Sequence, residues 1–255
     1  MRRIAILFCV IVGALLIWGS TDFPDWADPK SPASTHVSNE YITEAYGTTH
    51  VPNLVSAILA DYRNFDTMFE TTVVFTAGTA IFLILRLPLG PLARRRNSQH
   101  PEVEPQPLPR DPILEMACRI LFPPIQLFGF YVLTHGHYSP GGGFQAGVIL
   151  GASFILLGIG FDLRAVLSRF NEGLYRPLSA VGVSIYIGTG FLCLLLGGKF
   201  LDYEALRTIA PWLSHQMVRS HGILLVETGV TITVSSVIFA IYVNLVSRGN
   251  HREGL

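Results

Sequence analysis

The chain has 255 residues, of which half are hydrophobic and only 14% are charged. Its mean hydropathy of +0.44 is too high for an ordinary soluble domain of this length and predicts a membrane protein. Because 18 basic and 18 acidic residues cancel to a net charge of zero, nothing in the charge balance points to a nucleic-acid partner.

Six apolar runs are long enough to cross a hydrocarbon core, which needs about 20 helical residues. We therefore predict an all-α, polytopic membrane protein of about six transmembrane helices. The predicted spans are Ile4–Ser20, Thr67–Leu85, Ile113–Thr134, Phe144–Phe161, Leu178–Leu196 and Met217–Val246. Cys9, Cys118 and Cys193 lie in three different spans without metal-like spacing, so neither a disulfide framework nor a zinc site is expected.

The first apolar run, MRRIAILFCVIVGALLIWGS, has the basic start, short apolar stretch and following small residues of a secretory signal. It lacks an A-x-A cleavage pattern, and we therefore expect it to be retained as a membrane anchor. The alternative is a cleaved signal, which would leave an odd number of spans and place the C-terminus outside.

The basic residues predict the orientation of the chain in the membrane. With the N-terminus in the cytoplasm, 13 of the 18 Lys and Arg residues fall on inside segments and the other five fall outside. This is the bias that the positive-inside rule describes. We therefore expect an even number of spans, with both the N-terminus and the C-terminus cytoplasmic.

A polar segment divides the spans into two blocks. Residues 88–111, PLGPLARRRNSQHPEVEPQPLPRD, carry prolines and charges without a hydrophobic period, which is typical of a linker, here a cytoplasmic one. A two-span block, residues 1–87, precedes it. A four-span block, residues 112–247, and a cytoplasmic tail, residues 248–255, follow it. Asp111 before Pro112 is a favourable helix start, an N-cap oxygen followed by proline at the first helical position.

The stretch THGHYSPGGGFQAG joins the third and fourth predicted spans on the outer side. A phosphate-binding loop is improbable, since no strand precedes the glycines and no lysine follows them. We expect a tight turn in which Pro140 fixes φ and Gly141 and Gly142 adopt conformations closed to other residues. His135 and His137 are predicted to hydrogen-bond this turn at the interface, because an H-x-H pair without a nearby acid or cysteine is a weak metal signal.

Glycines and prolines also predict how the spans pack. Gly143, Gly147 and Gly151 recur every four residues, a seam of small residues that lets a neighbouring helix approach closely. Pro123 and Pro124 lie near the middle of the third span, where they remove backbone donors and are expected to kink the helix. The kink either only shapes the bundle or breaks the helix beside a wet cavity.

Two acidic regions are candidates for an ion path, since ionisable groups within a span are costly and usually face protein or water. Glu70 lies at the outer end of the second span, on the same helix face as Asp66. Asp61, Arg63 and Asp66 either form a charged vestibule with Glu70 or only solvate the interface. Thr67 and Glu70 also fit an S/T-x-x-E capping box, which is the structural alternative.

Glu227, deep in the sixth span, begins the second region. Thr231 and Ser235 follow it at four-residue steps on one helix face, and His221 precedes it. These oxygens are suited to Na⁺ or proton movement, because hard cations take oxygen ligands. The alternative is a buried acid that pairs with a neighbouring helix and only stabilises the packing.

The segment LFGFYVLTHGHYSPGGGFQAGVILGA resembles the hallmark of the B subunit (MnhB/MrpB-like) of Mrp-type multisubunit cation/proton antiporters. The four-span block from about Asp111 to Ser247 matches that subunit in length and layout. The segment HVPNLVSAILADYRNFDTMFETTVV is similar to the C-terminal part of the antiporter A subunit, a portion that is a separate small subunit in membrane-bound hydrogenases. Such a fusion departs from the usual stand-alone B subunit.

The resemblance implies an accessory, non-enzymatic membrane subunit of a monovalent cation (Na⁺)/proton antiporter in a bacterial or archaeal cytoplasmic membrane. It implies partner antiporter-type subunits, transported Na⁺ and H⁺, a surrounding lipid bilayer and no cofactor. It also implies a role in cation movement for Glu70. The alternatives are a subunit of the ion-pumping membrane module of a hydrogenase-like or other redox complex, and a purely structural scaffold.

Overall fold

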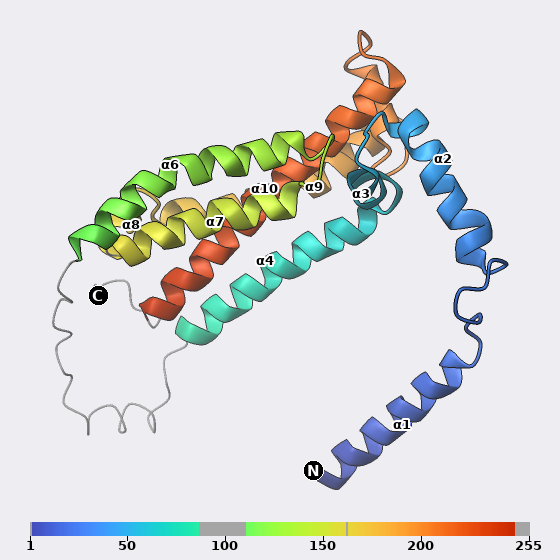
Figure 1. Cartoon of the computed structure of the whole chain (residues 1–255), viewed down its shortest axis with the longest axis horizontal. Coiled ribbons are helices and arrows are strands. Elements are labelled where there is room, and N and C mark those ends of the chain that lie inside the picture. The colour runs from blue at the N-terminus through green and yellow to red at the C-terminus, as the bar shows by residue number, and fades with distance from the viewer. Residues whose placement is uncertain (1, 87–110, 162, 248–255) are drawn as a thin grey trace. The chain divides into compact units, whose positions relative to one another are not determined.

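The computed structural model describes residues 2–86, 111–161 and 163–247 (Figure 1). Except for Asp111, the predicted linker at residues 88–111 lies outside the described residues, and so does the predicted tail at residues 248–255. The chain forms two compact units, Met1–Glu44 and Ala45–Leu255. The second unit therefore begins well before the predicted linker and contains both the end of the two-span block and the four-span block.

The described residues are mostly helical and contain no strand. Six helices in this part of the chain are long and apolar enough to span a membrane, which confirms the predicted all-α fold with about six spans. These helices are α1 (Arg2–Ser20), α4 (Asn64–Arg86), α6 (Pro112–His135), α7 (Gly143–Gly160), α9 (Glu172–Leu195) and α10 (His215–Val246). The shorter elements are η1 (Ala33–Val37), α2 (Ser38–Thr49), α3 (Leu54–Ala57), η2 (Ile58–Tyr62), α8 (Leu163–Leu167) and η3 (Tyr203–Thr208).

The first unit consists of α1, η1 and the first part of α2. The predicted span in α1 has no buried residue within the unit, and its exposed side chains are apolar on all sides, as in a helix surrounded by lipid. Whether this helix is retained as an anchor stays a prediction.

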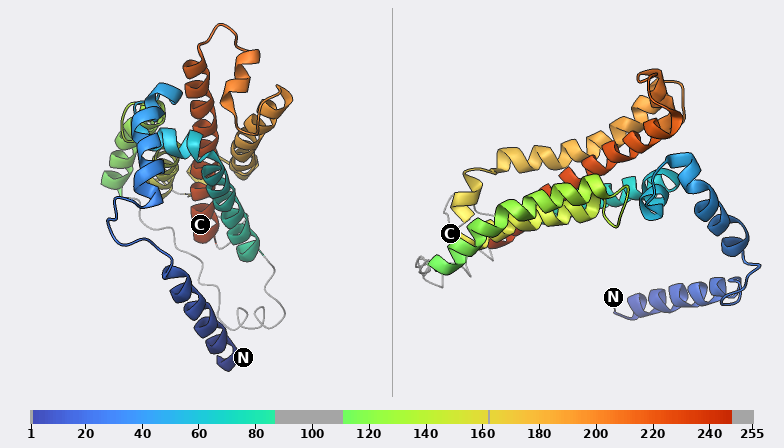
Figure 2. Two further views of the ribbon diagram at one scale, coloured as in Figure 1. Left: turned by 90° about the vertical axis from the view of Figure 1, so that its right-hand side faces the viewer. Right: turned by 45° about the horizontal axis from the view of Figure 1, so that its top comes forward.

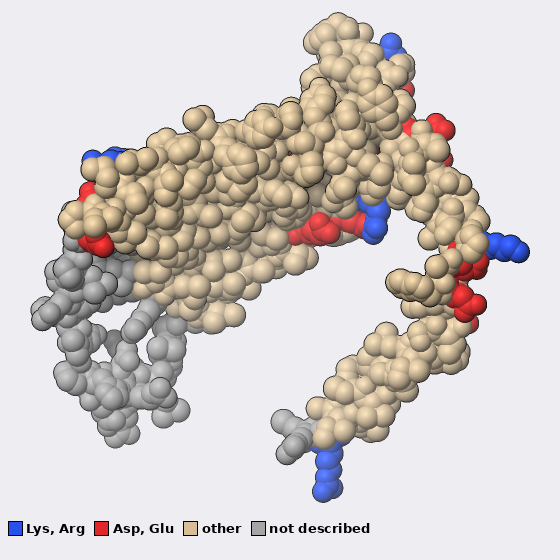
Figure 3. All heavy atoms as spheres, in the orientation of Figure 1, with Lys and Arg blue, Asp and Glu red and all other residues tan. Residues whose placement is uncertain are grey.

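In the second unit, α10 is the central helix, and α4, α7 and α9 all pack against it (Figure 2). It is 32 residues long, and 61% of its most apolar segment is buried, the largest share among the six candidate spans. Charged side chains on the face shown in Figure 3 lie near the helix ends and leave the middle apolar. This distribution fits a bundle whose middle lies in hydrocarbon.

Helix α9 extends beyond the predicted span because its terminal charges are paired. We predicted a span from Leu178, whereas α9 begins at Glu172 and includes Arg176, whose guanidinium lies 3.0 Å from the Glu172 carboxylate. The start of α6 agrees with the prediction, since the Asp111 carboxylate accepts hydrogen bonds from the backbone N–H groups of Ile113 and Leu114.

The third span does not break at its prolines. Helix α6 runs through Pro123 and Pro124 as one element from Pro112 to His135. Pro123 lines a groove of about 540 Å³ together with Phe122 and Arg119. The prolines therefore shape the surface of a continuous helix, and the predicted alternative of a helix break is wrong.

Helices α9 and α10 approach closely at a pair of glycines that the sequence pattern did not reveal. A Cβ placed on Gly229 would lie 2.7 Å from the Gly182 carbonyl oxygen, and one placed on Gly182 would collide with the Gly229 carbonyl oxygen and the Thr233 hydroxyl. Only hydrogen atoms fit between the two backbones at this crossing.

We predict that Gly182→Ala lowers the melting temperature of the detergent-solubilised protein, because overpacking a close crossing costs about 1–3 kcal/mol. The matched control is Gly188→Ala on the same helix, where a new Cβ would meet nothing within 4 Å. Equal melting temperatures for the two variants would show that α9 and α10 do not approach this closely.

Candidate functional site

The glycine-rich stretch forms a compact turn between α6 and α7. Gly142 has φ of 126°, a conformation that side chains with a Cβ rarely adopt, and its N–H donates to the Val132 carbonyl oxygen at 3.3 Å. A Cβ on Gly141 would lie 2.7 Å from the same Val132 oxygen and 3.2 Å from the Gly136 Cα, and one on Gly136 would lie 2.8 Å from the Gly142 nitrogen. Pro140 is exposed at the tip of the turn.

Side chains from the N-terminal part of the chain hold this turn in place. The Asn53 amide donates to the carbonyl oxygens of Gly136 and Ser139 at 2.7 and 2.8 Å, and the Ser56 hydroxyl donates to Gly136 at 2.9 Å. The backbone N–H of Asn53 donates to the His137 carbonyl oxygen at 2.8 Å. The turn is therefore closed by residues that lie at least 80 positions earlier in the chain.

The two histidines of the turn have different surroundings. His137 is buried, and its Nε2 lies 3.0 Å from the Ser220 carbonyl oxygen. Burial lowers the pKa of His137 below its ordinary value, so the neutral ring is the form that donates to this carbonyl. His135 stacks between Tyr131 and Tyr138. Among the described residues, no group of three or more His, Cys, Asp or Glu side chains could hold a metal ion.

The three spaced glycines of α7 face α10. A Cβ on Gly143 would lie 2.5 Å from the Glu227 carbonyl oxygen, and one on Gly147 would lie 2.7 Å from the Val234 side chain. At Gly151 the corresponding distance to the Ser235 carbonyl oxygen is 3.1 Å. This close approach fixes the first turn of α7 against the part of α10 that carries Glu227.

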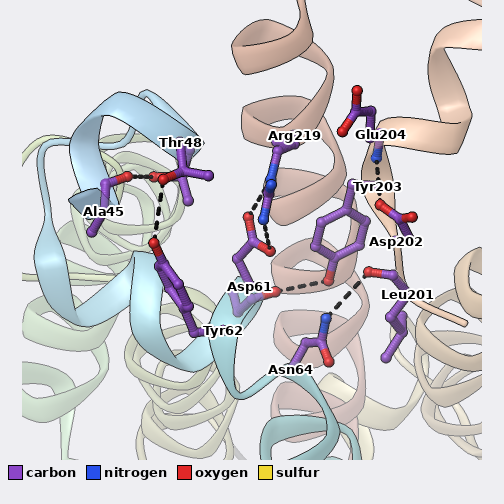
Figure 4. A network of polar contacts seen from close by, with 12 residues as sticks. Ala45, Thr48, Asp61, Tyr62, Asn64, Leu201, Asp202, Tyr203, Glu204 and Arg219 are labelled. Carbon is purple, nitrogen blue, oxygen red and sulfur yellow. Dashed lines mark hydrogen bonds and ion pairs between the residues drawn. The ribbon is translucent and has the colours of Figure 1, made fainter. Parts of the chain in front are cut away.

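A buried ion pair joins η2 to the first turns of α10 (Figure 4). The Arg219 guanidinium donates to both carboxylate oxygens of Asp61, at 2.7 and 2.9 Å, and the Asp61 side chain is only 6% exposed. The Tyr203 hydroxyl donates to the neighbouring Ala60 carbonyl oxygen at 2.8 Å. Burial raises the pKa of Tyr203 well above its ordinary value, so the phenol keeps the proton that this bond needs.

Asn64, the first residue of α4, is held from two sides. The side-chain amide of Asn64 donates to the Leu201 carbonyl oxygen at 3.2 Å, and the backbone carbonyl oxygen of Asn64 accepts from the Tyr186 hydroxyl at 2.9 Å. Both partners belong to the four-span block, on α9 and in the segment that follows it. The start of α4 is therefore fixed to the same elements that surround Arg219.

Glu70 and Glu227 line one small, partly open cavity, whose wall is formed by residues of α3, η2, α4, α9, α10 and the glycine-rich turn with the start of α7. Its volume of about 70 Å³ exceeds the roughly 10–15 Å³ that one water needs. Ser56, Thr67, Gln145 and Tyr186 contribute the other polar side chains of its wall. The structure thus brings together two acids that the sequence places in different blocks.

Glu227 is the buried member of this pair of acids. It is 7% exposed, and its Oε2 has no hydrogen-bond partner among the described residues. A Cβ on Gly142 would lie 3.0 Å from the other oxygen, Oε1, so a side chain at this point of the turn would crowd the carboxylate. Gly142 therefore lies directly against Glu227, and its φ of 126° independently favours glycine.

Glu70 does not close a capping box. Helix α4 begins at Asn64, and the Thr67 hydroxyl donates to the Leu59 carbonyl oxygen at 2.7 Å and does not cap the helix. The predicted capping role of Thr67 and Glu70 is therefore wrong, because the helix starts three residues earlier than the pattern suggests. Glu70 is exposed on α4 where it borders the cavity.

The other acidic and polar candidates lie outside the cavity wall. Asp66 pairs with Arg63 in an exposed contact at 2.5 Å, and His221 is exposed. The Thr231 hydroxyl donates to the carbonyl oxygens of Glu227 and Gly143, and the Ser235 hydroxyl donates to that of Ile232. The polar stripe below Glu227 therefore bonds to backbone groups in α10 and at the start of α7.

The sequence did not reveal Asn53, Ser56 and Tyr186 as parts of this region. The pattern Asn53-Leu-Val-Ser56 could have indicated a helix start, since Asn is a favourable N-cap residue. In the structure the Asn53 side chain does cap α3 by accepting a hydrogen bond from the Val55 N–H. Asn53 also donates hydrogen bonds to the glycine-rich turn, and because that turn lies more than 80 positions later in the chain, no local sequence pattern predicts this contact.

Two family models match the chain, and together they cover most of it. Residues 113–240 match the family described as the domain related to the MnhB subunit of Na⁺/H⁺ antiporter. Residues 2–93 match the MbhE family, which is described as a subunit of MBH. The boundary between the two matches falls within the predicted linker at residues 88–111 and the first residues of α6.

Individual relatives agree with these matches. An antiporter subunit named mnhB2 from Staphylococcus epidermidis is 31% identical over 135 residues, which cover 53% of this chain and 94% of that protein. The protein of the same name from Staphylococcus haemolyticus is 33% identical over 135 residues with the same coverage.

Two solved structures extend the similarity to almost the whole chain. A chain of the membrane-bound sulfane sulfur reductase, an archaeal respiratory membrane complex, is 26% identical with a TM-score of 0.63, covering 96% of this chain and 97% of that one. A chain of the Mrp complex from a Dietzia species is 26% identical with a TM-score of 0.54 and covers 94% of this chain. The match takes up 25% of that second chain, so this protein spans about a quarter of its length.

We predict that Asp61→Asn destabilises the protein by about 3 kcal/mol, because it leaves the largely buried Arg219 without its charged partner. The measurement is the melting temperature of Asp61→Asn, Arg219→Gln and the double variant, in which the second change should cost less than it does alone. The matched control is Asp66→Asn, which breaks an exposed pair worth about 0–1 kcal/mol. Additive effects of Asp61→Asn and Arg219→Gln would contradict the pairing.

Proposed function

The chain belongs to the MnhB family of antiporter subunits, and from this premise we propose that it is an accessory subunit of a multisubunit Na⁺/proton antiporter. Its antiporter-subunit relatives and its six candidate spans in the described residues support a role as a component of a transporter complex and not as an enzyme. The finer role assigned to it is to contribute carboxylates and helix packing to an ion path that other subunits complete.

The observation that carries this proposal is the shared cavity of Glu70 and Glu227. An isolated charged oxygen as buried as Glu227 Oε2 is very costly, so the group either holds a proton or is balanced by a cation. Sodium prefers oxygen ligands, which the two carboxylates, the Ser56 and Thr67 hydroxyls and water would supply. Replacing the proton by the cation, and the cation by the proton, is the elementary step of cation/proton antiport.

The exposure of Glu70 supports a path shared between chains. Glu70 borders the cavity from a helix that would lie in hydrocarbon if the protein were alone. A carboxylate at such a position usually faces protein or water. A neighbouring subunit packed on this face of α4 would shield Glu70 from lipid and continue the path from the cavity.

The topology assigned to the chain follows the same premise. Both termini and the segment at residues 88–111 lie on the cytoplasmic side of a bacterial or archaeal cytoplasmic membrane. The two-span block at residues 1–87 corresponds to the MbhE-like part, and the block at residues 112–247 to the MnhB-like part. Asp61 then lies at the outer end of the bundle, where its pair with Arg219 positions the cavity wall.

A second function is supported by one specific observation. The chain of the sulfane sulfur reductase complex matches this protein over nearly the full length of both chains, including the junction of the two blocks. The alternative is therefore a subunit of the ion-pumping membrane module of a respiratory redox complex, in which partner subunits carry the redox centres. A structural scaffold without any part in ion movement is the third possibility.

We predict that Glu227→Gln, in the complex assembled with its native partner subunits, abolishes Na⁺-dependent proton movement in inverted membrane vesicles, because the amide can neither release a proton nor balance a cation. Glu70→Gln is expected to have the same effect. The measurement is dequenching of a pH-sensitive dye on addition of Na⁺. Glu204→Gln, an exposed acid outside the spans, is the control. Unchanged exchange in both cavity variants would favour the scaffold.

The partners distinguish the antiporter from the redox complex. We expect that affinity purification of the chain from its native membrane recovers several large, many-span antiporter-type subunits and no iron–sulfur protein. Mass spectrometry of the purified complex makes the identification. Recovery of iron–sulfur subunits at equal stoichiometry would instead establish the redox alternative.

A further inference from the structure

An apolar groove lies on the outside of the bundle and shares no lining residue with the carboxylate cavity. Helices α4 and α9 form its two walls and α10 forms its floor. The groove has a volume of about 680 Å³ and is lined by Phe75, Thr79 and Phe82 on α4 and by Pro177 and Ala180 on α9. Neither wall carries a charge until the ends of the two helices are reached.

Two arginines and one glutamate lie together at that end. The Arg86 guanidinium donates to both Glu172 carboxylate oxygens at 2.8 Å, and Arg176 lies 3.0 Å from the same carboxylate. Both guanidinium groups also stack on Phe82, at 3.9 and 4.4 Å from the ring centroid. This cluster carries one positive charge in excess, and the Arg176 side chain, 56% exposed, presents it beside the groove.

The distance along α4 from the inner end of the groove to the arginine cluster matches one leaflet of a membrane. Arg86 follows Phe75 by 11 positions on α4, which is about 16 Å at 1.5 Å per residue. One half of a hydrocarbon core is about 15 Å thick. Between these walls α4 and α10 are in contact, since a Cβ on Gly78 would lie 2.5 Å from the Val237 side chain, and both residues line the groove.

We propose that this groove binds an anionic phospholipid, with one acyl chain along Phe75, Thr79 and Phe82 and the phosphate at Arg176. The positive charge of Arg176 at the end of the groove selects an anionic headgroup. Guanidinium groups bind phosphate oxygens in a bidentate manner. A transmembrane helix of another subunit would need contact over the whole hydrocarbon thickness of about 30 Å, whereas the lining residues from Phe75 to Phe82 cover only about 10 Å of α4. The lipid would stabilise the junction of α4 and α9, which the Arg86–Glu172 pair also makes.

The test uses the full-length protein in its native complex, extracted in mild detergent and reconstituted with equal amounts of phosphatidylglycerol and phosphatidylethanolamine. Native mass spectrometry measures how much of each lipid remains bound. Arg176→Gln is expected to lower retained phosphatidylglycerol about fivefold, the effect of one basic side chain beside anionic lipid. Thr79→Trp, which fills the groove without changing its charge, is expected to displace the lipid as well.

The matched control is Arg63→Gln, which removes an arginine of similar exposure, 59%, from an exposed pair with Asp66 far from Arg176 in the bundle. Retention of phosphatidylglycerol should not change in this variant. Equal retention in the wild type, Arg176→Gln and Thr79→Trp would overturn the proposal. A photoreactive phenylalanine analogue at position 79 provides an independent test, since a lipid adduct supports the proposal and an adduct with a partner subunit overturns it.

Discussion

The Asp61–Arg219 ion pair spans 158 positions of sequence and joins the segment before α4 to the central helix of the bundle. Because both groups are largely buried, neither can lose its partner without leaving a charge in a poor environment. The pair fixes η2 against α10, and the Tyr203 and Tyr186 hydroxyls add hydrogen bonds to Ala60 and Asn64 on either side of it. The described part of the N-terminal block from Ala45 onwards is therefore an integral part of the bundle.

This junction is also what creates the carboxylate cavity. Glu227 comes from α10 and Glu70 from α4, while the glycine-rich turn supplies a wall with no side chain at Gly142. Asn53 and Ser56 hold that turn from the N-terminal side. The four-span block carries the buried acid, and residues of the segment 55–70 supply the rest of the wall around it. The two parts of the chain that match different family models thus meet in one small space.

The sequence was informative where a property is local. Apolar length predicted the six spans, Asp111 and Pro112 predicted the start of α6, and the glycine-rich motif identified the family. The sequence was uninformative where distant groups meet. The partner of Asp61, the second role of Asn53 and the close approach of Gly182 to Gly229 depend on tertiary packing, which no periodicity encodes. The capping pattern at Thr67 failed because tertiary contacts at Asn64 start the helix earlier.

The most direct test of this account is to sever the chain between residues 87 and 110 and produce both parts together in a host without related complexes. If buried contacts join the blocks, an affinity tag on the first part should recover the second part at equal stoichiometry from detergent extracts. Combining Asp61→Asn with Asn53→Ala should then release it. Separate purification of the two unsubstituted parts would contradict the account, because the connecting segment alone would then hold the blocks together.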